Sequence, residues 1–186
     1  MATAAMPSMG PRRTRRWLIA GGVALVALCI AAGIAGVVLA ADRLATTHYR
    51  LDGDAMSPCF SDGATIAATR LDATGRRALR RGDIVVFEAP VRASKPYFKR
   101  VIAVGGDTIA IRDRQVILNG VVLAEPYVEQ PTNSRYPLGG AESYLVPTDT
   151  LFVLGDNRNN SSDSRAFGPV ALDRVTHTIT TPCTVP

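Results

Sequence analysis

Lysine is scarce in this chain, and the chemistry that it can do differs from that of arginine. Of 21 basic residues only Lys95 and Lys99 are lysines. Arginine stays protonated in proteins, whereas a buried lysine can lose its proton and act as a general base. In a strand, Lys99 would share a face with Tyr97, Val101 and Ala103. Spacing leaves two alternatives open: an inward face, where desolvation lowers the lysine pKa, or an edge strand, where the side chain extends to water. We expect Lys95, which precedes a proline, to be solvated.

Two other segments carry candidate chemistry. Gly155–Arg165 is a run of eleven small or polar residues after an apolar stretch. It predicts either a surface loop with Asx turns or a buried polar network that supports a site. Asp52–Phe60 by itself predicts a turn with one exposed methionine. His48 and His177 have no neighbouring pattern that assigns them a role, so a Ser-His-Asp triad is not indicated.

The elements that must position these residues are mostly strands. Short runs rich in β-branched or aromatic residues alternate with prolines and glycines, and Asn119-Gly120 is a strong hairpin signal. No long stretch has helical periodicity, so the sequence predicts a mainly β fold, a compact antiparallel β domain. The expected strands are Ala64–Thr69, Asp83–Phe87, Tyr97–Val104, Thr108–Ile111, Val116–Leu118, Val121–Leu123, Ser143–Val146, Thr150–Leu154 and Arg174–Thr180.

The net charge and the hydrophobic residues are concentrated near the N-terminus. The chain has 186 residues and a net charge of +5, of which four charges are arginines in residues 1–16. The remainder has 17 basic and 16 acidic residues, so a nucleic-acid-binding domain is not indicated. Trp17–Ala41 has no charge and 21 apolar residues out of 25, enough for a helix that crosses a bilayer.

These features predict three parts: a basic cytoplasmic tail (1–16), a transmembrane anchor (17–41) and an extracytoplasmic β domain (42–186). The orientation follows from the positive-inside rule, and the protein would be single-pass in the plasma membrane, in contact with lipid. The alternative is a cleaved signal peptide, because Val38-Leu39-Ala40 before Ala41 resembles a cleavage site. Signal-peptide apolar cores span about 7–15 residues, which favours the anchor.

The three cysteines exclude a disulfide-rich scaffold and make a closed zinc site improbable. Cys29 lies in the apolar run, and no C-x-x-C is present. One bridge, Cys59 to Cys183, is allowed if both residues are in an oxidising compartment and close together.

Taken together, the segments resemble bacterial type I signal peptidases (signal peptidase I, the S26 serine peptidases) over nearly the whole chain. Arg81–Phe87 is similar to the family's R-G-D-I-V-V-F strand. Lys99-Arg100 with Gly106-Asp107 is similar to its lysine motif, K-R-x-x-x-x-x-G-D. Gly155–Arg165 reproduces its G-D-N-R-x-N-S-x-D-S-R loop, followed by Phe167-Gly168-Pro169.

The resemblance implies an endopeptidase that removes signal peptides from exported pre-proteins after small residues. Its Ser/Lys dyad uses the lysine to deprotonate a serine, which attacks the scissile carbonyl. By this resemblance Lys99 is the general base, and Ser161 hydrogen-bonds and orients it. Asp163 and Arg165 form a structural ion pair, and Asp156 adds structural support. The dyad needs no cofactor or metal.

One departure from the family concerns the nucleophile. The family's G-x-S-M-x-P-T-L motif reads Gly53-Asp54-Ala55-Met56-Ser57-Pro58-Cys59-Phe60 here. Ala55 stands at the nucleophile position and has no oxygen that could attack. Gly53 and the Ala55 backbone N–H could still form an oxyanion hole, but no acyl-enzyme would follow.

Three explanations remain open. Ala55 is an engineered change; or it marks a natural, non-catalytic homologue that binds pre-proteins or pairs with an active paralogue; or Ser57 is the nucleophile. In an extended chain Ser57 is displaced by roughly 6–7 Å along the strand, whereas reacting atoms must approach to about 3 Å.

Overall fold

A computed structural model of the chain describes residues 28–34, 46–88, 95–134 and 138–183. The chain divides into two units, residues 1–42 and 43–186. In the first unit, residues 28–34 are helical, and the rest of the expected tail and anchor lies outside the described residues. Among the residues that are described, no helix has the length and apolar character needed to span a membrane.

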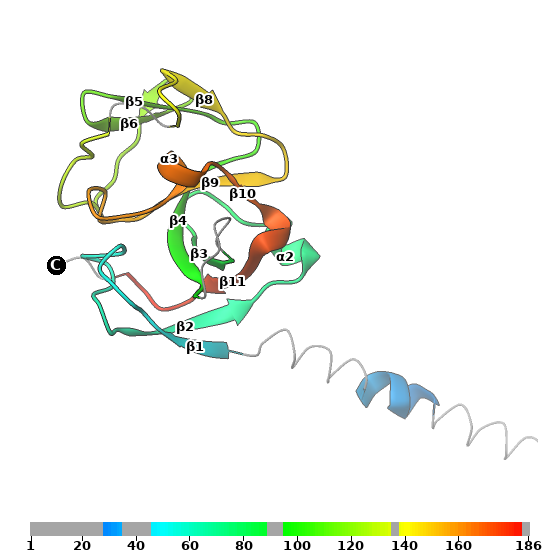
Figure 1. The fold of residues 1–186 in the computed structure, drawn as a ribbon. Coiled ribbons are helices and arrows are strands. Elements are labelled where there is room, and N and C mark those ends of the chain that lie inside the picture. The colour runs from blue at the N-terminus through cyan, green and yellow to red at the C-terminus, as the bar shows by residue number, and fades with distance from the viewer. Residues whose placement is uncertain (1–27, 35–45, 89–94, 135–137, 184–186) are drawn as a thin grey trace, which may run out of the picture. The chain divides into compact units, whose positions relative to one another are not determined.

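The second unit is built from two antiparallel sheets, as expected for a mainly β domain. The larger sheet has the strand order β1-β2-β11-β3-β4-β9-β10, and the smaller has the order β7-β6-β5-β8. Figure 1 shows β5, β6 and β8 at one end of this unit and the β1–β2 pair at the other. The strands are β1 Thr46–Arg50, β2 Thr65–Arg70, β3 Ile84–Phe87, β4 Tyr97–Val104, β5 Thr108–Arg112, β6 Gln115–Leu118, β7 Val121–Val122, β8 Ser143–Leu145, β9 Thr150–Leu154, β10 Val170–Ala171 and β11 Val175–Ile179.

The described residues of this unit also form three short helical turns: α2 (Ala73–Arg77), α3 (Ser164–Phe167) and the 3-10 turn η1 (Leu172–Arg174). The Asp72 side chain caps α2 by accepting from the Gly75 N–H, and Asp163 caps α3 by accepting from the Arg165 N–H. Such caps satisfy N–H groups that have no partner within the helix.

The predicted strands match the observed ones closely, while β1 and β10 were not predicted. The hairpin between β6 and β7 turns at Asn119 and Gly120, with φ values of 50° and 82°. Two successive positive φ values are the geometry of the type I′ turn that Asn-Gly favours. The residues of β1, Thr-Thr-His-Tyr-Arg, lack a clear apolar alternation, because this strand is at the edge of the sheet and only two of its side chains are partly covered.

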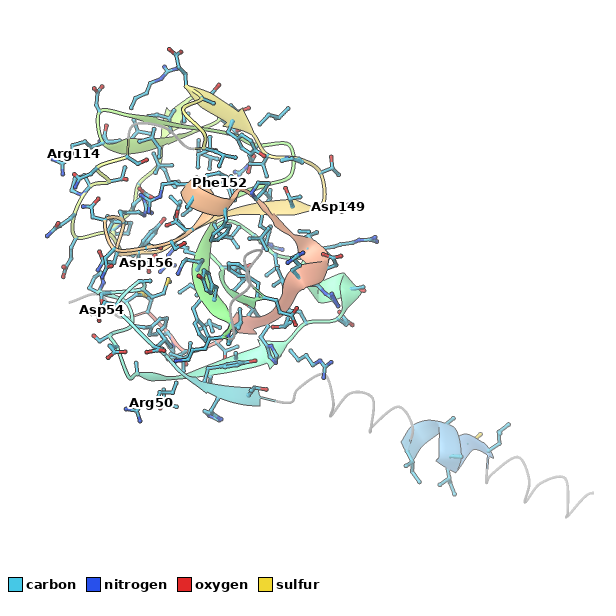
Figure 2. All side chains as sticks on the ribbon, in the orientation of Figure 1. Arg50, Asp54, Arg114, Asp149, Phe152 and Asp156 are labelled. Atoms are coloured by element: carbon cyan, nitrogen blue, oxygen red, sulfur yellow. A yellow bond between two sulfur atoms is a disulfide. The ribbon has the colours of Figure 1, made fainter. Side chains whose placement is uncertain are left out.

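Three apolar clusters form the core. One joins β4 and β9 to the smaller sheet, with Phe152 at 0% exposure. The second, which includes Val85, Val101 and Val153, lies on the other face of the larger sheet. The third contains Met56 and Phe60 and packs on Ile66 and Ile84. Figure 2 shows Phe152 inside the unit and Arg114 and Asp149 at its surface.

β4 is irregular, which corrects one part of the face prediction. Its register against β9 shifts between Val101 and Ala103. Consequently Ile102 and Ala103 both join the first cluster, while Val101 and Val104 pack with the second. Ala103 therefore does not share the face of Lys99 that strict alternation predicted, because a bulge adds one residue to the period of two.

Candidate active site

A cleft with a volume of about 790 Å³ opens between the end of β1 and the start of β4. One wall comes from Tyr49–Gly53 and the other from Lys95–Lys99. Ala55, Met56, Asp62, Gly63 and Ser162 complete its lining. The cleft thus brings together Ala55 and Lys99, which are 44 positions apart in the sequence.

Lys99 is buried in a central strand, which decides between the two alternatives for this residue. β4 lies between β3 and β9 in the sheet, and Lys99 is only 5% exposed. Its Nζ lies 5.3 Å from the centroid of the Tyr97 ring. No hydrogen bond or ion pair among the described residues involves this amine, so it meets the cleft as an unpaired group.

Burial makes Lys99 a much weaker base than an ordinary lysine. Desolvation lowers its pKa from 10.5 to about 8, with a smaller contribution in the same direction from the Arg165 charge. The carboxylates of Asp163 and Asp156 act in the opposite direction. A lysine with this pKa is partly neutral near pH 7.5 and can accept a proton from a hydroxyl group.

Ala55 begins a turn, as the sequence predicted for Asp52–Phe60, so the extended chain used as a reference for placing Ser57 does not apply here. Residues 55–59 are turn residues, with hydrogen bonds from the Ser57 N–H to the Asp54 carbonyl (3.0 Å) and from the Phe60 N–H to the Met56 carbonyl (2.9 Å). Met56 is 1% exposed and anchors the turn in the core, rather than being exposed as predicted. The peptide bond between Ser57 and Pro58 is cis. Ser57 is not among the described residues that line the cleft, whereas Ala55 is.

The backbone amides of this turn differ from the expected oxyanion pair. The Gly53 N–H donates to Asp62 Oδ1 at 2.7 Å, and the Asp62 N–H in turn donates to Asp54 Oδ1 at 3.2 Å. A carboxylate therefore already occupies the Gly53 N–H, which makes this amide unavailable to a substrate in this conformation. No sequence signal pointed to Asp62, because the contact joins residues nine positions apart in a loop.

Ser161 packs against Gly155 and the nucleophile-position turn. The Ala55 carbonyl accepts a hydrogen bond from the Asn157 N–H (3.1 Å). A Cβ added to Gly155 would lie 2.5 Å from this carbonyl oxygen and closer still to Ser161 Oγ. Only glycine fits there, because real Cβ atoms essentially never approach other atoms within 3.0 Å.

Ser161 Oγ is buried and has no hydrogen-bond partner among the residues that the structure describes. The hydrogen bond to Lys99 that the resemblance implied is therefore not made in this structure. A buried hydroxyl without a partner is unusual, because most such groups are satisfied.

The polar segment after β9 is largely a buried network. Asp163 is 0% exposed; it forms an ion pair with Arg165 at 2.7 Å and accepts from the Gly155 N–H at 3.1 Å. Ser164 Oγ accepts from the Val153 N–H at 2.9 Å. These bonds hold the loop against the end of β9 and fix the backbone beside Ala55.

Asp156 has a buried ion-pair partner, Arg100, that the sequence did not indicate. Arg100 donates to both of its carboxylate oxygens, at 2.8 and 2.6 Å, and its guanidinium lies 3.9 Å from the centroid of the Tyr127 ring. Burial raises the pKa of Asp156, while the hydrogen bonds and charge of Arg100 lower it. The position of Arg100 next to Lys99 is a signal that could have been read, whereas Tyr127 carried none.

Cys59 and Cys183 form a disulfide, with their Cα atoms 5.0 Å apart. The bridge ties the turn that begins at Ala55 to the segment after β11. Asp156 lies close to both sulfurs, and this is the one group of potential metal ligands among the described residues. Because the cysteines are bonded to each other, they offer no thiolate to a metal ion.

At the rim of the cleft, Lys95 forms an ion pair with Asp52 that joins the two walls. The pairing lowers the pKa of Asp52 and raises that of Lys95. Both side chains are exposed, so Lys95 is solvated as predicted. The two lysines of the chain thus line one cleft, and their pKa values are shifted in opposite directions.

Comparison with known proteins gives consistent matches. A family model described as signal peptidase, peptidase S26, matches residues 20–183. Signal peptidase IB of Staphylococcus aureus is 31% identical over 173 residues, covering 86% of this chain and 83% of the relative. Signal peptidase I V of Bacillus subtilis is 33% identical over 150 residues, covering 75% of this chain and 88% of the relative. A crystal structure of a signal peptidase I from Enterococcus faecalis is 36% identical, with a TM-score of 0.46, covering 52% of this chain and 92% of that one.

Proposed function

This chain belongs to the signal peptidase family, peptidase S26, and from that premise we propose that it binds the signal peptides of exported pre-proteins in the cleft beside Lys99 but does not cleave them. The observation that carries the proposal is that Ala55 and Lys99 line one cleft. A base is present there, and the position beside it has a methyl group where the family has a nucleophile.

We propose that the peptide binds as an added strand. β9 pairs with β4 only from Arg100 onward. Within the described part of the chain Tyr97–Lys99 therefore have no partner strand on that side, and they line the cleft. An extended peptide can satisfy such backbone groups, with side-chain pockets conferring specificity. The amide groups of the substrate would form these bonds whether or not residue 55 can attack.

Residue roles follow the same reasoning. Lys99 is the proposed base, Ser161 its proposed orienting partner, and the Ala55 N–H a proposed oxyanion donor. The Asp163–Arg165 and Arg100–Asp156 ion pairs support the backbone on which these groups lie. For Gly53 to join the oxyanion hole, the Asp62 carboxylate would have to leave its N–H.

The active alternative uses Ser57, and the geometry of the turn weighs against it. Ser57 is absent from the described cleft lining, and its N–H is held by Asp54. The non-catalytic alternative, a binding or regulatory partner of an active paralogue, is compatible with the cleft. An engineered change at Ala55 would give the same structure.

We also propose that residues 1–16 are cytoplasmic, 17–41 form a single transmembrane anchor, and 42–186 form the extracytoplasmic domain. The support is the uncharged stretch and the arginine cluster before it. This arrangement would place the domain on the side of the membrane at which exported pre-proteins emerge. The anchor would be in contact with lipid.

The decisive experiment compares the full chain with its Ala55→Ser variant, in detergent, on a purified pre-protein. We expect no cleavage by the unaltered chain and cleavage after the signal peptide by Ala55→Ser, with kcat/KM rising with pH through about 8 as Lys99 loses its proton. Ala55→Ser/Lys99→Arg is the matched control and should be silent. Cleavage by the unaltered chain that Ser57→Ala abolishes would contradict the proposal.

Binding needs a separate measurement, because a silent enzyme can still hold its ligand. A fluorescent signal peptide with alanines at −1 and −3 should bind the unaltered chain, and a version with phenylalanine at both positions should not. Equal affinity for the two peptides would exclude specific binding in the cleft.

A further inference from the structure

The Lys99 amine has no hydroxyl group at position 55 to act on, yet it remains available in the cleft. The hydroxyl groups among the described lining residues belong to Tyr49, Tyr97 and Ser162, and none of them bonds to Lys99. Lys99 is 5% exposed, and the buried Met56 also lines the cleft. Of the two amines that line the cleft, Lys95 is ion-paired with Asp52. The Lys99 amine lies over the Tyr97 ring and has no hydrogen bond or ion pair among the described residues.

We propose that Lys99 is a carbonyl-capturing site, whose amine forms a reversible imine with aldehydes that enter the cleft. A lysine desolvated in an apolar pocket is a well-known way to obtain a neutral, nucleophilic amine. The proposal does not depend on signal-peptide binding, because a small aldehyde needs only access to the amine.

The chemistry balances without a cofactor. Lys99 first releases its ammonium proton to solvent, and the neutral nitrogen adds to the aldehyde carbon to form a carbinolamine. Loss of the carbinolamine oxygen as water then leaves a carbon–nitrogen double bond. No electrons are gained or lost, and hydrolysis by water returns the free amine and the aldehyde.

The charged groups around the amine support reaction near neutral pH. Burial and Arg165 lower the Lys99 pKa to about 8, against the opposite influence of Asp163 and Asp156. Roughly a quarter of the Lys99 side chains would then be neutral at pH 7.5. The pairing with Asp52 raises the Lys95 pKa above 10.5, so less than about 0.1% of Lys95 would be neutral at that pH.

Because the chain has only two lysines, Lys95 is an internal control for Lys99. Lys95 is more accessible, with 70% of its side chain exposed. Access to the aldehyde therefore favours reaction at Lys95, whereas the larger neutral fraction favours reaction at Lys99. A less basic amine is also a weaker nucleophile, as with thiols. This offsets part of the rate advantage that the larger neutral fraction gives Lys99. We therefore expect Lys99 to react at least tenfold faster at pH 7.5.

The test treats the purified full chain in detergent with propionaldehyde and sodium cyanoborohydride, which reduces each imine to a stable propyl-lysine. Mass-spectrometric peptide mapping then gives the rate of labelling at each lysine between pH 6 and 11. We expect Lys99 to be labelled first, with a rate that rises through about pH 8 and then levels. Lys95→Arg should retain this labelling, and Lys99→Arg should lose it.

The map of the unaltered chain is sufficient without variants, so misfolding of Lys99→Arg cannot obscure the result. Circular dichroism after reduction verifies that the labelled chain is folded. Labelling of Lys95 as fast as Lys99 at pH 7.5, or a Lys99 rate that rises without levelling up to pH 10.5, would overturn the proposal. Neither result depends on whether the Ala55→Ser variant cleaves a pre-protein.

Discussion

Lys99 retains the environment of a general base although the neighbouring nucleophile position is an alanine. Its burial lowers its pKa to about 8, and a pKa shift of this kind has a cost in stability. The folded protein disfavours the ammonium form that the unfolded chain retains up to about pH 10.5. Under the proposal that the chain binds signal peptides without cleaving them, such an environment is retained because the cleft still has a ligand.

A stability measurement tests the environment of Lys99 independently of activity. The folded pKa lies below the unfolded value, so the unfolded chain binds more protons between pH 8 and 10.5, and the free energy of unfolding rises with pH across this window. The shift corresponds to about 3 kcal/mol. Lys99→Met should therefore be more stable than the unaltered chain at pH 7, and this advantage should shrink by about 3 kcal/mol by pH 11.

Chemical denaturation of both chains in detergent, followed by circular dichroism, gives the two free energies. The difference between variant and unaltered chain is the quantity to compare, because other titrating groups cancel in it. A difference that stays constant from pH 7 to pH 11 would show that the amine is not desolvated.

At the scale of elements, the site depends on a loop after β9 and a turn after β1 that touch each other. Gly155 is the point of closest approach, packed between Ser161 and the Ala55 carbonyl. The Asp163 network holds the loop, and the third apolar cluster holds the turn through Met56. Small changes at this contact should act on the cleft more than on the rest of the domain.

We expect Gly155→Ala to abolish signal-peptide binding, because its Cβ would push the loop and the turn apart. In the Ala55→Ser background the same change should abolish cleavage. Gly120→Ala is the matched control: it lies in a hairpin with open space around it and a φ of 82°, so it strains the backbone without reaching the cleft. If Gly155→Ala binds the peptide as tightly as Gly120→Ala, this contact does not shape the site.

The disulfide is the second device that fixes the turn. The bridge between Cys59 and Cys183 joins residues that are 124 positions apart in the sequence. Removing a native disulfide typically lowers the free energy of unfolding by about 2–5 kcal/mol, in line with the loop-closure entropy that the bridge removes from the unfolded chain. Cys183→Ser should lower the free energy of unfolding by roughly this amount and weaken peptide binding. Cys29→Ser, at the exposed free cysteine, is the control.

Denaturation in oxidising and reducing buffer provides the measurement. The reductant should lower the midpoint of the unaltered chain and of Cys29→Ser, but not that of Cys183→Ser. An unchanged midpoint for the unaltered chain would mean that the bridge contributes little to stability.

At the scale of the whole molecule, the proposed topology can be tested in intact cells. Protease added outside should degrade residues 42–186 and spare an epitope tag placed before the arginine cluster. The reason is the positive-inside rule, which keeps the four arginines of residues 1–16 in the cytoplasm. Protection of the domain would contradict the topology, and loss of the tag as a released fragment would favour a cleaved signal peptide.

Most strands could be predicted from the sequence because alternation and turn residues are local signals. β4 and β9 were predicted at their observed bounds, and Asn119-Gly120 at its turn. The edge strand β1 was missed, because its pairing with β2 comes from tertiary contact rather than from an apolar pattern. The face of Ala103 was predicted wrongly because a bulge in β4 has no signature in residue types.

What the sequence alone determined about this protein is its family, its supply of chemical groups and the absence of a hydroxyl at position 55. Motif residues carry that information one position at a time. Only the tertiary structure decided that Lys99 is buried in a central strand, that Met56 is buried in the core and that Asp62 occupies the Gly53 N–H. Each of these depends on contacts between distant segments, since burial, and with it the lysine pKa, is set by what packs around a residue rather than by its neighbours in the chain.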